Sequence, residues 1–136
     1  MMTSSTIKHY SFDSTIDSLA RVEQIVESIK EEFAIPEEIY GNILVATSEG
    51  MNNAIKHGNL FDSSKTVEFS FDVTEKEYIF TISDKGAGFD YNNVPDPTHP
   101  DNIEKVDGRG IFIMKSLTDE VEFEREGATV ILKFNK

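Results

Sequence analysis

The chain has 136 residues, of which 38% are hydrophobic, and it carries a formal net charge of -12. This length and apolar content fit one domain that buries a core without disulfides or a structural metal. Cysteine is absent, which excludes disulfide frames, thiolate zinc sites and thiol nucleophiles. The negative charge disfavours direct contact with nucleic acid or an anionic membrane surface, but it allows a nucleotide that arrives with a divalent cation.

The first twelve residues lack the apolar core of a signal peptide, and no window approaches the length of a membrane span. We therefore expect a cytoplasmic protein with no membrane contact. Its acidity also suits docking against a basic partner surface, although many acidic proteins are merely soluble.

The N-terminal third predicts a short edge strand followed by a helix. The strand is expected over Ile7 to Phe12. Apolar residues then recur at helical intervals from Leu19 to Phe33. We expect this helix to start at Asp13 and Ser14, because Ser14 and Asp17 have the spacing of a capping box.

A second helix is expected from Pro36 to Gly58. Proline is tolerated in the first turn of a helix, and the acids Glu37 and Glu38 favour the positive end of the helix dipole. Gly58 is the expected stop. The apolar residues of this helix form two stripes, which predicts that it lies between two apolar surfaces.

The second half predicts two pairs of strands separated by a loop and a helix. Residues 66–73 and 77–83 alternate apolar with polar and are expected to form an antiparallel hairpin. Residues 90–107 hold three of the four prolines and are expected to form a lid loop. A short helix is predicted from Gly110 to Leu117, and strands at 120–124 and 129–134 close the chain.

The pair Glu49 and Asn53 is unusual in a helix with apolar stripes. The two side chains are four residues apart and therefore share one helical face. The amide oxygen of Asn53 suits a magnesium ion held by phosphates, and Glu49 suits a base that takes a proton from a hydroxyl or water. The structural alternative is that both residues cap loops or bond a neighbouring strand.

Two glycine-containing loops accompany this pair. Asp84 ends a predicted strand and is followed by Gly86 and Gly88, an arrangement that lets the backbone approach a flat ligand while the carboxylate accepts an amino group such as that of adenine. An ordinary turn has the same pattern. The run Gly108-Arg109-Gly110 stands before the predicted third helix, where backbone amides form an anion site and Arg109 adds a cation for phosphate.

The order Glu-x-x-x-Asn, Asp-x-Gly-x-Gly, Gly-x-Gly resembles the N box and two glycine boxes of the superfamily of gyrase, histidine-kinase, heat-shock-chaperone and mismatch-repair ATPases, called GHKL. Within it, residues 48–59 and 108–121 resemble the small anti-sigma-factor serine kinases. The likeness covers nearly the whole chain. It implies a single domain over residues 1–136 with the Bergerat fold, an α+β two-layer sandwich with helices on one face of a mixed, mostly antiparallel sheet.

The resemblance also implies a role for each motif residue. By motif position, Asn53 would bind magnesium and Glu49 would act as the base. Asp84 would bind the adenine amino group, and Gly86 and Gly88 would shape the adenine pocket. Gly108 and Gly110 would lie at the phosphates under the lid. Two positions depart from the family pattern. Val106 stands where some members have an arginine, and Gly127-Ala128-Thr129 stands where the family often has Gly-Thr.

The function implied by the resemblance is that of an ATP- and Mg2+-dependent serine kinase that acts as an anti-sigma factor. Such a protein dimerises, binds a sigma factor, and phosphorylates a serine on an anti-anti-sigma antagonist. One alternative is a non-catalytic module that senses ATP or ADP and sequesters a sigma factor or another regulator. Another is the ATP-binding part of a histidine-kinase relay.

Overall fold

Five strands form a sheet in the order β1-β2-β3-β5-β4. A computed structural model of the chain describes residues 7–86 and 106–136. The strands are β1 (Lys8–Asp13), β2 (Thr66–Val73), β3 (Glu77–Ser83), β4 (Glu120–Glu124) and β5 (Thr129–Asn135). Each pairing among these strands is antiparallel. The predicted mostly antiparallel character is thus confirmed, but the described strands contain no parallel pair, so among them the sheet is not the mixed one that was expected. As expected, β1 is an edge strand.

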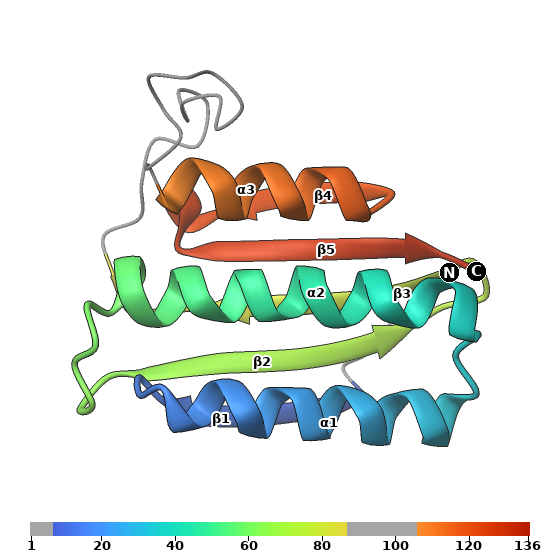
Figure 1. Cartoon of the computed structure of the whole chain (residues 1–136), viewed down its shortest axis with the longest axis horizontal. Helices are drawn as coiled ribbons and strands as arrows, with labels where there is room; N and C mark the ends of the chain where they lie inside the picture. The colour runs from blue at the N-terminus through green and yellow to red at the C-terminus, as the bar shows by residue number, and fades with distance from the viewer. Residues whose placement is uncertain (1–6, 87–105) are drawn as a thin grey trace.

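Three helices cover one face of this sheet, which confirms the two-layer α+β sandwich (Figure 1). They are α1 (Asp17–Phe33), α2 (Glu37–Asn53) and α3 (Val106–Leu117). The middle helix, α2, packs against α1, α3 and the central strands β3 and β5. This agrees with the expectation that the helix lies between two apolar surfaces. The packing places the end of α2 close to the end of β3 and the start of β5. None of the described helices is long and apolar enough to cross a bilayer.

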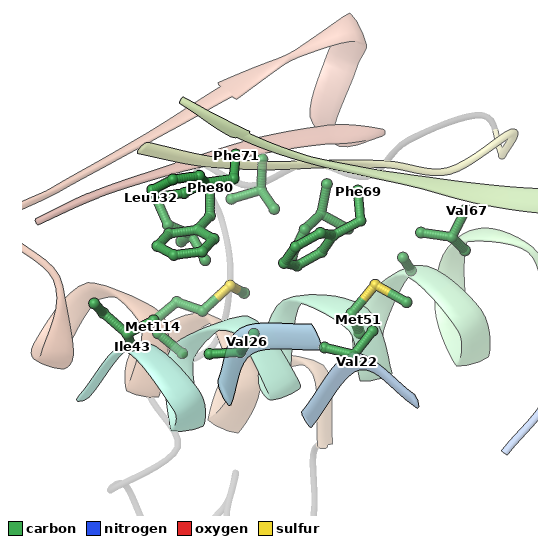
Figure 2. Packing of buried hydrophobic residues seen from close by; sticks show 14 of the residues in the cluster. Val22, Val26, Ile43, Met51, Val67, Phe69, Phe71, Phe80, Met114 and Leu132 are labelled. Atoms are coloured by element: carbon green, nitrogen blue, oxygen red, sulfur yellow. The ribbon is translucent and has the colours of Figure 1, made fainter. Parts of the chain in front are cut away.

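The core lies between the two layers and is rich in phenylalanine. Alternation along β2 and β3 turns Phe69, Phe71 and Phe80 toward the helices, where all three are fully buried. The rings of Phe71 and Phe80 pack with centroids 5.0 Å apart. Figure 2 shows Met51 of α2 and Met114 of α3 reaching toward these rings. This packing fixes α2 and α3 over the sheet and so determines where their ends lie.

Two predicted helix starts are wrong. The first helix begins at Asp17 with Ile16 as its N-cap and without a side-chain cap. Ser14 is buried and its hydroxyl donates to the carbonyl of Lys65 at 2.6 Å, so it joins two loops and does not take part in a capping box. The reason is that this contact spans 51 residues of sequence, which local spacing does not reveal.

The third helix begins at Val106, earlier than the predicted Gly110. Glycine has a low helix propensity, but packing of the whole segment against α2 overrides that local preference. Gly108 and Gly110 therefore lie within the first turns of α3. The last two residues of the predicted lid belong to α3, and the remainder of the lid lies outside the described residues.

The predicted end of the second helix is confirmed. After Asn53 the chain makes one π-helical turn, Ala54–Gly58. The backbone N–H of Asn59 then donates to the carbonyl of Ala54 at 2.8 Å, which closes this turn. Gly58 is thus the last residue of the helical segment.

Candidate functional site

A pocket opens where the end of α2 meets α3, the end of β3 and the start of β5. It encloses about 560 Å³ of empty space, a volume that includes its open mouth. Much of its wall is apolar and includes Ile82, Ile111 and Val130. The polar and titratable side chains in that wall are Asn53, His57 and Asp84. An apolar pocket with a few convergent polar groups suits a flat, partly polar ligand.

Asp84 is the buried carboxylate of this pocket, with 6% of its surface exposed. One of its oxygens, Oδ1, accepts the backbone N–H of Gly86 at 2.7 Å. Burial raises the pKa of Asp84, and the hydrogen bond from Gly86 and the charges of Arg125 and Lys85 oppose that rise. A carboxylate has several acceptor positions, so Asp84 can also accept a donor from a ligand in the pocket.

Two glycines make room for this carboxylate. A Cβ added at Gly58 would lie 2.2 Å from the carboxylate of Asp84, and one added at Gly86 would lie 2.3 Å from the carbonyl oxygen of Gly58. Both distances are far too short for any side chain. A side chain at Gly86 would therefore meet the backbone of Gly58. Gly58, which the sequence identifies only as a helix stop, is a second component of the same site.

Asn59 joins the segments around Asp84 and was missed by sequence reasoning. Its side chain is 1% exposed, and its Oδ1 accepts the backbone N–H of Lys85 at 2.7 Å. Its Nδ2 donates to the hydroxyl of Ser14 at 2.8 Å and to the carbonyl of Thr66 at 3.1 Å. The only signal in the sequence was the position of Asn59 at the end of the Glu49-Asn53 motif.

Asn53 is the last residue of α2 and lines the same pocket. Its Oδ1 is buried and has no hydrogen-bond partner among the described residues. A Cβ added at Gly110 would lie 3.0 Å from both terminal atoms of the Asn53 amide, so glycine lets α3 approach this side chain closely. An unpartnered buried amide oxygen costs free energy. A hard cation such as Mg2+ is a suitable partner for it, so the residues present fit a metal here.

The remaining predicted residues have different positions relative to the pocket. Glu49 is half-buried one turn before Asn53, as expected for the flank of α2, but it is not part of the pocket wall. Arg109 is exposed on α3. Gly108 lies in the first turn of α3. Gly88 and the side chain of Val106 lie outside the part that the structure describes.

His57 lies at the end of the helical segment that contains Asn53. It lies in the π turn, and its side chain contributes to the pocket wall.

The turn between β4 and β5 contributes Gly127 and Ala128 to the pocket wall. Its backbone is left-handed at three successive positions, Arg125, Glu126 and Gly127, with φ of 51°, 58° and 96°. Thr129, which follows Gly127-Ala128 where the family often has Gly-Thr, is buried, and its hydroxyl lies 2.7 Å from that of Ser83. Its hydroxyl therefore already has a partner within the protein.

Comparison with known proteins agrees with this geometry. A family model described as a histidine kinase-like ATPase domain matches residues 12–134, nearly the whole chain. Proteins named serine-protein kinase RsbW from two Staphylococcus aureus strains, JH9 and Newman, are each 33% identical to it over 94 residues. The match covers 64% of this chain and 59% of each relative.

The matched residues include the Glu49-Asn53 pair and both glycine-containing loops. The pocket contains Asn53 and Asp84, each next to a glycine from another segment, and the sheet and helices have the expected two-layer arrangement. The chain belongs to the histidine kinase-like ATPase family.

Proposed function

We propose that this protein is an ATP- and Mg2+-dependent serine kinase that acts as an anti-sigma factor. The observation that carries the proposal is the buried, unpartnered Oδ1 of Asn53 in a pocket that also holds the buried carboxylate of Asp84. The Oδ1 of Asn53 suits a metal ion that is bound to phosphate groups. The carboxylate of Asp84 suits an amino group at the other end of a nucleotide. The names of the RsbW relatives support the choice of a serine as acceptor.

The adenine end of the nucleotide is assigned to Asp84. Its carboxylate would accept the exocyclic amino group of adenine, and the apolar wall would contact the faces of the ring. Gly58 and Gly86 keep this region free of side chains. Gly88 belongs to the same glycine box by sequence and is proposed to shape the same pocket.

The phosphate end is assigned to Asn53 and the start of α3. The first backbone amides of a helix have no acceptor within that helix, and they lie at the positive end of its dipole. Gly108 and Arg109 belong to this turn, and Gly110 lies against the amide of Asn53. These groups can bind phosphate oxygens. Residues 90–105 are proposed to close over them as a lid.

Glu49 is proposed to act as the base of the transfer reaction. Its carboxylate would accept the proton of the serine hydroxyl while the serine oxygen attacks the γ-phosphorus, and ADP would leave as the bond to the β-phosphate oxygen breaks. When bound at Asn53, Mg2+ would neutralise charge on the phosphate oxygens. The protein contributes mainly positioning, which suits a compact site of this kind.

The partners follow from the same assignment. We propose a sigma factor and an anti-anti-sigma antagonist as the bound proteins, a homodimer as the working form, and the cytoplasm as the location. The net charge of -12 supports docking against basic surfaces of such partners. We propose no direct role for nucleic acid.

The decisive experiment measures transfer of labelled γ-phosphate to proteins that an ATP-dependent pull-down recovers from the source cell. We expect Glu49→Gln to lower the transfer rate about 10²- to 10⁴-fold, because it removes the base, while the ATP affinity stays close to that of the wild type. Asn53→Ala is expected to weaken Mg2+-dependent ATP binding itself. Glu38→Gln and Asn42→Ala, at exposed positions on the same helix, are the matched controls.

The outcomes separate three possibilities. Transfer at the normal rate by Glu49→Gln would show that another group is the base. If the wild-type protein binds Mg2+-ATP and a partner without transferring phosphate, the protein is a non-catalytic ATP sensor. Acid-labile phosphate on the product would identify a histidine acceptor and a relay function.

A further inference from the structure

The main chain of Asp84 is held on both sides by the turn between β4 and β5. The backbone N–H of Asp84 donates to the carbonyl of Ala128 at 2.9 Å. Its carbonyl accepts Nη1 of Arg125 at 3.1 Å. The same Nη1 lies 3.4 Å from the hydroxyl of Thr129, so the guanidinium contacts two segments at once. Asp84 directly follows β3, and the Arg125 side chain supplies a donor at this point.

We propose that Arg125 is a positioning residue that holds Asp84 in the orientation needed to recognise the amino group of adenine. This inference rests on the proposed function of the pocket. Arg125 is not part of the pocket wall, so it acts through Asp84 and not by touching the nucleotide. Arg125 lies outside the three motifs to which the resemblance assigns roles.

The backbone of the turn supports this role. Arg125 and Glu126 both have left-handed φ values, a conformation that costs free energy for residues with a Cβ. The carbonyl of Arg125 accepts the N–H of Ala128 at 3.1 Å, which closes the turn. The strained turn thus brings both the Ala128 carbonyl and the Arg125 guanidinium to the main chain of Asp84.

The charge of Arg125 acts in the same direction as its hydrogen bonds. Burial raises the pKa of Asp84, whereas the positive charges of Arg125 and Lys85 lower it and favour the carboxylate that accepts a donor. His57 is the other titratable side chain in the pocket wall. Removal of the Arg125 charge is therefore expected to raise the pKa of Asp84 further. On acidification, nucleotide binding would then be lost at a higher pH than in the wild type.

The test compares three variants of the full chain. Arg125→Gln removes the charge, Arg125→Lys keeps it, and Glu126→Gln changes the neighbouring exposed residue of the same turn. Affinity is measured by calorimetry for Mg2+-ATP and for the Mg2+ complex of purine riboside triphosphate, which lacks the exocyclic amino group. Melting temperatures without nucleotide show whether each variant folds as the wild type does.

We expect Arg125→Gln to weaken ATP binding about three- to tenfold, the effect of one hydrogen bond to a fixed group. The loss should be smaller for purine riboside triphosphate, smaller again for ATP in Arg125→Lys, and absent in Glu126→Gln. The pH at which ATP affinity falls on acidification should rise only in Arg125→Gln.

An equal loss for both nucleotides, or wild-type ATP affinity in Arg125→Gln, would overturn the role of Arg125. Failure of the wild-type protein to bind ATP would instead overturn the assignment of the pocket, and this inference with it. The same set of measurements therefore distinguishes failure of the role of Arg125 from failure of the pocket assignment.

Discussion

Asp84 combines a stability cost with a binding role. Its pKa is raised above the ordinary 3.8, chiefly by burial, with Gly86, Arg125 and Lys85 opposing the rise. A folded-state pKa above the unfolded one means that the folded state binds this proton more tightly. The stability that protonation contributes is complete below pH 3.8 and is lost as the pH rises through the folded pKa. At neutral pH the ionised Asp84 therefore opposes folding.

We expect Asp84→Asn to be at least as stable as the wild type at pH 7, and yet to bind ATP roughly 10- to 100-fold more weakly. Asparagine keeps an oxygen for the N–H of Gly86 but loses the charge that accepts the adenine amino group. Calorimetric titration with ATP and thermal denaturation measure the two effects separately.

Acidification provides a second readout for the same residue. Wild-type ATP affinity should fall as the pH drops through the raised pKa of Asp84, whereas the affinity of Asp84→Asn should not show this step. Asp62→Asn, at an exposed loop residue, is the control and should behave like the wild type. Wild-type ATP affinity in Asp84→Asn would remove Asp84 from the recognition of adenine.

The residues of the site differ in how well the sequence predicts them. Asn53 and Asp84 were predicted because their chemistry stands out against the local apolar pattern, and both line the pocket. Gly58, Asn59 and Arg125 were not assigned to the site. Gly58 and Asn59 contact residues that lie 26 positions away in the sequence, and Arg125 contacts one that lies 41 positions away. No local sequence pattern encodes contacts over such separations.

At the scale of elements, strands were predicted more accurately than helix starts. Alternation with period two predicted all five strands within a few residues. The pattern is clearest in β2, β3 and β5, where every second residue along much of the strand is buried. The starts of α1 and α3 were misplaced, since helix ends depend on which side chains meet the orphan amides and on packing with other elements. For α3, a glycine that disfavours a helix locally is needed for contact with α2.

Gly110 tests that interpretation. Alanine improves helix propensity by about 1 kcal/mol, but its Cβ would lie 3.0 Å from the Asn53 amide, so the amide must move by a few tenths of an ångström. We expect Gly110→Ala to change the melting temperature little and to weaken Mg2+-dependent ATP binding about threefold or more. The measurement is ATP affinity as a function of Mg2+ concentration.

Gly41→Ala is the matched control on α2. A Cβ at Gly41 meets no atom within 4 Å, so alanine there should stabilise the fold by about 0.5–1 kcal/mol and leave ATP binding unchanged. Equal ATP affinities in Gly110→Ala and wild type would show that the amide of Asn53 is not held in place by the closeness of α3.

At the scale of the whole molecule, the site exists only in the folded chain. It combines the end of α2, the end of β3, the start of α3 and the β4–β5 turn, which come together because β3 and β5 pair at the centre of the sheet under α2. A ligand of this pocket therefore binds the folded state and not the unfolded one. Such a ligand must raise the stability of the entire domain.

We expect Mg2+-ATP at a hundred times its dissociation constant to add about 2.7 kcal/mol to the free energy of unfolding. For a domain of this size that is a rise in melting temperature of roughly 5–15 °C, measured by differential scanning calorimetry. ATP with a chelator should give a smaller rise, because the Oδ1 of Asn53 then has no metal, and Asn53→Ala should lose the Mg2+-dependent part. An equal rise with and without Mg2+ would contradict the metal site, since the buried oxygen of Asn53 would then contribute nothing to nucleotide binding.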